Sequence, residues 1–315
     1  MKPKMLLFGG FGWAASSPLI YTLQRNAKYA HFGYTKHFRI LYPEGVEGKV
    51  KEQPEKRISY IYEKVCDGTW ENYKSDEQFS HRMNLSIDLE PLKDFPRKHF
   101  TDLITGSPTI SKYLDYYHSL HDHVVSKGYK SVGDGFMGVK YNKSIFKEYF
   151  KIIKSEFDVK FLFITRDPVR RLFSQYLATM QGGIDKKREK PLPLRIKPIN
   201  YVIDIKKVNE IFDEENVHVI VMEELWEDDG TAKKELSEFL DHPITELWKN
   251  LYAPDRGHLV EFDKDVPCQE FGQDLLELTP DTYNSLKKKY QEIYDDWENY
   301  YGSLPLYWGQ PITYS

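Results

Sequence analysis

Residues 161–176 read FLFITRDPVRRLFSQY, and the change in character midway indicates a strand followed by a helix. The apolar run at 161–165 is typical of a parallel strand that is covered on both faces. Asp167 is a favoured residue just before a helix, and Pro168 suits the first helical position. We therefore expect Arg166 at the carboxyl end of a buried strand, beside the positive end of a helix.

This strand end favours anion binding. The start of a helix offers free amide groups, and a planar guanidinium can bind a phosphate through two parallel hydrogen bonds. Ser174, about two turns along the predicted helix, adds a hydroxyl, and Arg171 precedes it by three residues. The spacing alone also fits a structural role, in which Arg166 caps a carbonyl or pairs with Asp167 and Ser174 is a small packed residue.

The pattern R-D-P-x-x-R-x-x-S-x-Y in residues 166–176 closely resembles a segment of the sulfotransferases that use 3′-phosphoadenosine-5′-phosphosulfate (PAPS). In that family the segment binds the 3′-phosphate, so the resemblance implies this role for Arg166 and Ser174. It also implies a P-loop NTPase-like sulfotransferase fold, an α/β fold with a central parallel sheet flanked by helices. Arg170 departs from the pattern, because the family commonly has an acidic residue there.

Residues 5–18, MLLFGGFGWAASSP, predict a strand, a turn of small residues and a helix near the amino terminus. Glycines let the backbone approach a ligand, and amides at a helix start can bind phosphate or sulfate oxygens. In the resemblance this loop holds the 5′-phosphosulfate, and the expected contacts are Gly10, Gly12, Trp13, Ala14, Ala15, Ser16 and Ser17. Trp13 stands where the family usually has a cation that stabilises the departing phosphate, and the candidate replacements are Lys36 and Lys140.

The same loop leaves other classes of protein open. A P-loop kinase is disfavoured because G-x-x-x-x-G-K-[ST] is absent. Residues 10–15 satisfy G-x-G-x-x-A of dinucleotide-binding domains, but the acid expected about 20 positions later is missing, since the first carboxylate is Glu44. An NADP-dependent Rossmann oxidoreductase tolerates that absence. A secretory signal is also compatible with Lys2, Lys4 and the small residues at 14–16, although cleavage there would destroy the loop.

Residues 34–41, YTKHFRIL, look like the K-E-x-x-F/Y-L segment of Golgi-type and glycan-modifying sulfotransferases, including those that act on heparan sulfate. His37 takes the place of a glutamate that is the base in several relatives. An imidazole with a pKa of about 6.5 suits proton removal at neutral pH. The resemblance therefore implies His37 as general base and Lys36 as the group that neutralises the leaving phosphate. A lone histidine beside aromatic residues also commonly has a structural role.

Three further segments resemble the family less specifically. Residues 101–108, TDLITGSP, look like a substrate-side segment without its lysine, and we expect a strand at 102–105. Residues 216–225, NVHVIVMEEL, read as a scaffolding strand that ends in two acids. Residues 255–258, DRGH, look like a loop that folds over the cofactor, which makes Arg256 and Gly257 candidate cofactor contacts. An ordinary surface turn explains this short match equally well.

The overall charge excludes one class of partner and points to another. The formal net charge is -4, so nucleic acid is not the expected main partner. The amino-terminal 43 residues contain no acid, which predicts a positive local potential suited to a nucleotide. The basic, proline-interrupted segment 181–200 is expected to be a loop, either plainly solvated or a lid over the acceptor.

Length and cysteine content restrict the organisation. With 315 residues and 40% hydrophobic content, we expect a single domain over 1–315 with a variable insertion at about 43–100. No apolar run is long enough to span a membrane, and Cys66 with Cys268 gives no disulfide framework, so we expect a cytoplasmic protein. His118 and Asp122 share a helix face, but no third ligand follows with a recognised spacing, so no metal is expected.

The order of the elements predicts a layered α/β fold. We expect strands at 5–9, 38–42, 102–105, 160–165 and 217–223, and helices at 18–28, 111–126, 143–155, 168–180, 231–241 and 282–301. Such alternation is typical of a parallel sheet with helices on both faces. The resemblance then implies an enzyme that transfers a sulfuryl group from PAPS, leaving PAP, to a hydroxyl or amine, on a glycan by preference. Because of Trp13, a silent PAP-binding protein is the alternative.

Overall fold

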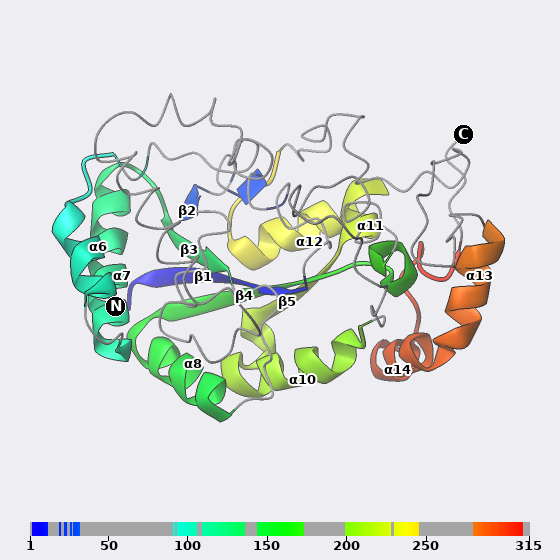
Figure 1. Cartoon of the computed structure of the whole chain (residues 1–315). Coiled ribbons are helices and arrows are strands. Elements are labelled where there is room, and N and C mark those ends of the chain that lie inside the picture. Colours follow the sequence, from blue (N-terminus) through cyan, green and yellow to red (C-terminus); the bar gives the residue numbers. More distant parts are fainter. Residues whose placement is uncertain are drawn as a thin grey trace, which may run out of the picture.

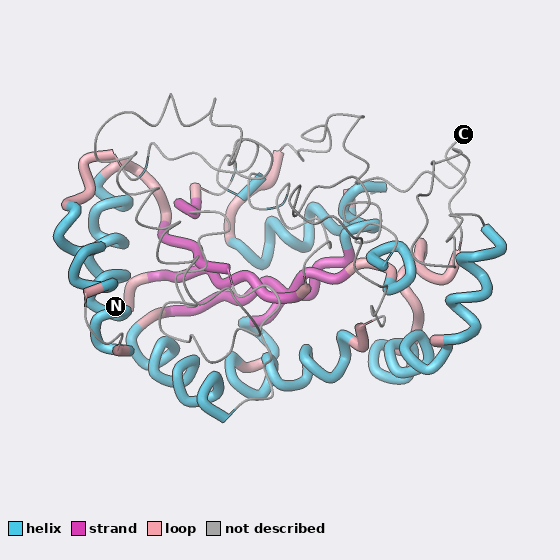
Figure 2. The backbone as a smooth tube through the Cα atoms, in the orientation of Figure 1, coloured by secondary structure: helices cyan, strands magenta, loops and turns pink. Residues whose placement is uncertain are grey.

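The computed structural model describes residues 2–11, 19, 22–23, 26, 28–31, 91, 93–105, 109–135, 144–172, 199–227, 230–245 and 280–310. Within these residues a parallel sheet forms the middle layer, and helices cover both of its faces (Figure 1). Figure 2 shows the twisted strands as one central band between the helices. The expected α/β class with a central parallel sheet is confirmed.

The sheet has five described strands in the order β2-β3-β1-β4-β5, and every pair is parallel. Their bounds are β1 (Lys4–Gly10), β2 (Tyr29–His31), β3 (Ser131–Gly135), β4 (Asp158–Thr165) and β5 (Val217–Val221). The strands expected at 5–9 and 160–165 are confirmed as β1 and β4, which lie side by side at the centre. Among the described strands, β3 separates β1 from β2.

Two hydrophobic cores lie on the two faces of the sheet. Successive strand residues point to opposite faces, so Met5 and Leu7 enter one core while Leu6 and Phe8 enter the other. The four side chains are at most 1% exposed. Full burial on both faces explains why β1 and β4 are continuous apolar runs without alternation.

The helices that cover these cores follow from their apolar stripes. Their bounds are α6 (Arg97–Ile104), α7 (Ile110–Ser126), α8 (Ser144–Glu156), α10 (Tyr201–Phe212), α11 (Met222–Glu227), α12 (Thr231–Leu240), α13 (Pro280–Lys289) and α14 (Gln291–Tyr301). Helices α8 and α10 cover one face and α12 the other (Figure 1). The expected helices at 111–126, 143–155 and 231–241 are confirmed, and the helical, buried Leu19 and Leu23 agree with a helix at 18–28.

Two expectations about secondary structure are wrong. The strand expected at 102–105 belongs to α6, where Phe100 and Leu103 form a buried helical face; a short apolar run does not distinguish helix from strand. The single helix expected at 282–301 is two helices, because the chain breaks at Tyr290 with φ −119° and ψ 29°. Its end at Gly302, which has φ 84°, is as expected.

Other elements were not predicted or cannot be compared. No sequence pattern predicts β3, because its five residues SVGDG contain a single large apolar side chain. The sequence patterns also do not predict α6, α10 or the short helix α11 that follows β5. The strand expected at 38–42, most of the insertion at about 43–100 and most of the 181–200 loop lie outside the described residues.

His218 on β5 makes the stability of this fold sensitive to pH. Its ring stacks on Phe239 of α12, with 5.2 Å between ring centroids. Burial lowers the pKa of His218 to about 4, against about 6.5 for an unperturbed histidine. Between pH about 4 and about 6.5, His218 is therefore mostly neutral in the folded protein and mostly protonated in the unfolded chain.

We predict that the free energy of unfolding falls as the pH drops from about 6.5 towards 4, because protons bind the unfolded state first. At about 1.4 kcal/mol per pKa unit, the loss between pH about 7.5 and about 5 amounts to about 2 kcal/mol. His218→Phe keeps a ring against Phe239 and removes this part of the pH dependence. Denaturant unfolding of both proteins at the two pH values measures it, and parallel pH profiles would contradict the assignment.

Candidate anion-binding site

The site lies where β1 and β4 end together. Gly10 at the end of β1 pairs with Ile164 of β4, and Arg166 follows two residues later. Gly10 has φ 114°, and a Cβ there would overlap the carbonyl oxygen of Ile164. Only glycine fits this position. The two segments singled out in the sequence therefore leave the sheet at the same edge, from neighbouring strands.

Asp167 is the N-cap that the sequence predicts. Its Oδ1 accepts hydrogen bonds from the backbone N–H groups of Val169 at 3.0 Å and Arg170 at 2.9 Å. Residues 168–172 are helical, which confirms the start of the expected helix at Pro168. The Asp167 side chain is fully buried. A charged cap in this position stabilises the first turn and its positive end.

Arg166 is buried, with 6% of its surface exposed, and its Nε lies 3.8 Å from Oε1 of Glu223. Glu223 is the first acid after β5 and is equally buried. Its Oε1 also accepts the backbone N–H of Asp167 at 2.9 Å. Burial raises the pKa of Glu223, and the charge of Arg166 opposes that rise. This carboxylate therefore holds both the backbone and the side chain of the Arg166–Asp167 turn.

Three arginines are gathered in this turn. Arg166, Arg170 and Arg171 are each at most 6% exposed. Burial lowers the pKa of Arg171; Tyr201 opposes the effect, and the positive charge of Arg166 adds to it. Two buried guanidinium groups thus lie close enough to repel each other. An anion placed between such groups removes that repulsion and accepts their hydrogen bonds.

Aromatic side chains form the wall beside the arginines. The guanidinium of Arg171 lies 5.9 Å from the ring centroid of Phe11, the residue that follows β1. Phe11 contacts Tyr201 edge to face at 5.9 Å between centroids. Tyr201 is buried at the start of α10, and burial raises its pKa, an effect that Arg171 opposes. Tyr201 therefore stays a neutral phenol near the cationic pair.

The sequence patterns do not single out Tyr201, and they include Glu223 only in a scaffolding segment that ends in two acids. The N-cap Asn200, whose Oδ1 accepts the N–H of Val202, was an available signal for α10. Asn200 also ends the basic, proline-interrupted segment 181–200, whose composition favours a loop. Glu223 was expected to be scaffolding, which agrees with its hydrogen bond to the Asp167 backbone.

Among the sequence-predicted contacts, Gly10 and Arg166 are brought to one edge of the sheet. The others lie outside the described residues: Gly12, Trp13, Ala14, Ala15, Ser16, Ser17, Lys36, His37, Lys140, Ser174, Arg256 and Gly257. His118 and Asp122 have different neighbours, since Nε2 of His118 lies 3.8 Å from Glu156 and Asp122 lies 3.4 Å from His121. No helix in the described ranges has the length and apolar character needed to cross a bilayer.

Comparisons with known proteins find similar structures but no similar sequences. No family model matches the chain, and no curated protein matches its sequence. A sulfotransferase from Alicyclobacillus acidocaldarius is 14% identical with a TM-score of 0.48, over 97% of this chain and 98% of that one. The sulfotransferase domain of the curacin biosynthetic pathway is 12% identical with a TM-score of 0.47, over 81% of this chain and 79% of that one. The sulfotransferase domain of a Synechococcus olefin synthase is 13% identical with a TM-score of 0.46, over 96% and 97%. At such low identities, function has to be inferred from the residues of the site.

We predict that Gly10→Ala destabilises the protein by about 2–4 kcal/mol, because the new Cβ meets the β4 backbone and φ is positive. Gly128→Ala is the matched control: Gly128 also has positive φ, 83°, but has open space around it. The control should lose only about 1–2 kcal/mol. Urea unfolding measures both variants, and equal losses would show that close approach to β4 is unimportant.

Proposed function

We propose that this chain is a PAPS-dependent sulfotransferase that transfers a sulfuryl group to a hydroxyl or amine of a carbohydrate acceptor. The observation that carries the proposal is that Arg166 and Arg171 are both buried beside a helix start, at the edge of the sheet where β1 and β4 end together. These two residues are the arginines of the R-D-P-x-x-R-x-x-S-x-Y pattern. A 3′-phosphate offers the dianionic, multiply accepting group that such a pair favours.

The position of the pair supports a nucleotide as the ligand. Nucleotides bind to open α/β sheets in the crevice at the carboxyl ends of the strands. Arg166 lies at that edge, and Gly10 lies at the same edge at the end of the neighbouring strand, two residues before the segment 12–17 in the sequence. In the proposal, the backbone amides of this loop hold the 5′-phosphosulfate together with Ser16 and Ser17. Ser174, Arg256 and Gly257 complete the contacts to the 3′-phosphate and adenosine.

The strand order argues against the NADP-dependent alternative. A dinucleotide-binding domain of the Rossmann type has the order 3-2-1-4-5-6, which places its first two strands side by side. Among the described strands of this chain, β3 lies between β1 and β2. The G-x-G-x-x-A match at residues 10–15 therefore stands in a different sheet topology from the one in which that motif binds a dinucleotide.

The proposed chemistry divides the work between the donor site and a base. PAPS supplies the activated sulfuryl group, and PAP is the product. His37 removes the proton of the acceptor group as that group attacks, and Lys36 stabilises the negative charge that develops on the 5′-phosphate side. Arg166 and Ser174 fix the nucleotide so that attack is in line. Positioning and preorganised charge then supply most of the acceleration.

We predict that the protein binds PAP more tightly than AMP, and that Arg166→Ala weakens PAP about 30- to 100-fold while AMP changes less than twofold. The reason is that Arg166 contacts only the 3′-phosphate, through charge-assisted hydrogen bonds. Arg166→Lys keeps the charge beside Glu223 without the planar fork, so its PAP affinity should be intermediate. Calorimetry with PAP, AMP, ATP and NADP measures these differences. Tight NADP binding without PAP binding would instead favour an oxidoreductase.

We also predict transfer from labelled PAPS to an acceptor in a panel of hydroxylated and amino glycans. His37→Ala should lower kcat by about 10²- to 10⁴-fold, as expected for loss of a general base, and leave the affinity for PAP unchanged. Binding of PAP by the wild type without transfer to any acceptor would favour the silent PAP-binding protein. An unchanged kcat in His37→Ala would remove His37 from the proposed mechanism.

A further inference from the structure

The last described part of the chain contacts the turn at Arg166 and Asp167 directly, although more than 100 residues separate the two in the sequence. Residues 280–310, which we call the C-terminal segment, comprise α13, α14 and the turn after them. In Figure 1 the two helices lie at the end of the sheet where β4 leaves it. Side chains and backbone of the C-terminal segment reach both buried carboxylates of the site, Asp167 and Glu223.

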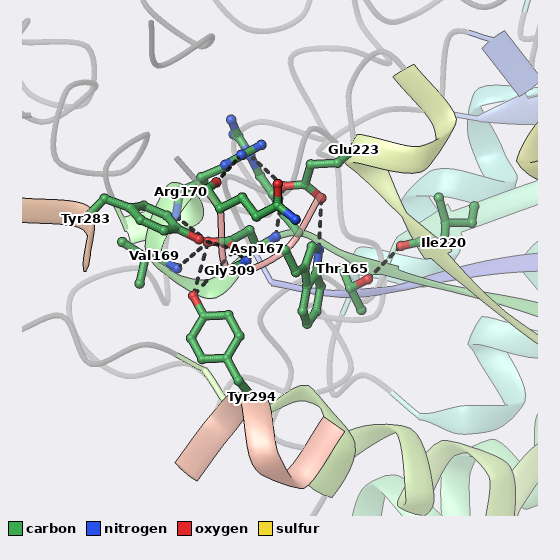
Figure 3. Close-up of polar contacts among 12 residues, drawn as sticks. Thr165, Asp167, Val169, Arg170, Ile220, Glu223, Tyr283, Tyr294 and Gly309 are labelled. Carbon is green, nitrogen blue, oxygen red and sulfur yellow. Dashed lines mark hydrogen bonds and ion pairs between the residues drawn. The ribbon is translucent and has the colours of Figure 1, made fainter. Parts of the chain in front are cut away.

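Asp167 receives three donors from the C-terminal segment. Its Oδ2 accepts hydrogen bonds from the hydroxyl of Tyr283 at 2.7 Å and from the backbone N–H of Gly309 at 2.9 Å. The hydroxyl of Tyr294 donates to Oδ1 at 3.3 Å. Figure 3 shows Tyr283 and Tyr294 pointing at this carboxylate from two different helices. Together with the two amides of its own helix, these donors compensate a fully buried charge.

Glu223 receives one donor from the same segment, the indole N–H of Trp308. This group donates to Oε2 at 3.2 Å, while Oε1 faces Arg166 and the Asp167 backbone. Trp308 and Glu223 are both at most 5% exposed, so the bond is made away from water. The indole thus fixes one oxygen of the carboxylate whose other oxygen lies beside the Arg166 guanidinium. The Nε atom of Arg166 lies 3.8 Å from that other oxygen, within ion-pair distance.

Arg170 provides a further link to the C-terminal segment. Its Nη2 donates to the carbonyl of Gln310 at 2.6 Å, and its charge lowers the pKa of Glu223 against the effect of burial. The sequence has this arginine where the resembled family commonly has an acid. The exchange fits the surroundings, since an acid here would be a third buried carboxylate beside Asp167 and Glu223.

We propose that Trp308 is a positioning residue of the donor site, which acts through Glu223 to orient Arg166 for the 3′-phosphate. The proposal rests on the proposed function, because it takes Arg166 to be the 3′-phosphate contact. A purely structural role is the competing explanation, since Trp308 also packs against Trp297 with 4.4 Å between ring centroids. The two roles differ in what they do to ligand selectivity: a structural defect weakens all nucleotides, whereas a misplaced Arg166 weakens only those with a 3′-phosphate.

The test compares Trp308→Phe with Trp297→Phe. Each variant loses one indole from the same aromatic cluster, but Trp297 is not among the donors to Asp167 or Glu223 in the described part of the chain. Calorimetric titration with PAP and with AMP gives the selectivity. We expect Trp308→Phe to weaken PAP about tenfold, the size of one hydrogen bond to a charged group, with AMP changed less than twofold. Trp297→Phe should leave the PAP-to-AMP ratio of the wild type.

A double variant separates this inference from the proposed function. If Trp308 acts through Arg166, Trp308→Phe has no further effect on PAP affinity in the Arg166→Ala background. Equal weakening of PAP and AMP, or additive losses in the double variant, would overturn the positioning role alone. A wild type that does not distinguish PAP from AMP would overturn the proposed function instead.

A second variant covers the case in which Trp308→Phe does not fold. Tyr283→Phe removes only the hydroxyl that donates to Asp167, on the other side of the same turn. It should also lower the PAP-to-AMP ratio, because a shift of Asp167 moves the backbone N–H that donates to Glu223, the carboxylate beside Arg166. An unchanged ratio in a folded Tyr283→Phe protein would count against control of the donor site by the C-terminal segment.

Discussion

The buried carboxylate of Asp167 is the constraint on which the rest of the site depends. A charge that is fully removed from water must be surrounded by donors, or it destabilises the fold by several kcal/mol. Two of its donors are amides of the helix it caps, and three come from residues 283–309. The helix start and the C-terminal segment are therefore held together by one side chain. The same interaction fixes where Arg166 leaves β4.

Charge balance is the physical argument for proposing an anionic ligand in this region. Within the described residues of the turn, three buried guanidinium groups face two buried carboxylates, Asp167 and Glu223. Both carboxylates accept hydrogen bonds from backbone N–H groups and from aromatic side chains, and these hydrogen bonds orient the turn. The electrostatic effect of Arg166 on Arg171 shows that the cations remain in each other's field. A bound phosphate would place further negative charge beside these cations, and this electrostatic reason for ligand binding does not depend on any comparison.

Local sequence patterns predicted those parts of the fold that local chemistry determines. The apolar runs of β1 and β4, the Asp167–Pro168 helix start and the glycine stop at Gly302 all follow from neighbours within a few residues. The pattern failed for β3, which is central but carries small residues, and for 102–105, where four residues fit either period. The contact of Trp308 with Glu223 joins residues 85 positions apart. No single-sequence pattern contains that pairing.

The contacts of Glu223 and the departure from the family pattern at Arg170 have a common physical origin. From neighbouring residues alone, Glu223 only marks the end of a strand, and Arg170 only differs from the acid that is common in the resembled family. In the folded chain both face the C-terminal segment, and each is explained by the charge of the other. In the proposed phosphate site, a local motif would supply the ligand contacts and a distant segment would set their orientation. Substitutions in the C-terminal segment would then alter the selectivity for a 3′-phosphate without removing a ligand contact. The aromatic donors of this segment are therefore as useful for testing the proposed site as the motif residues are.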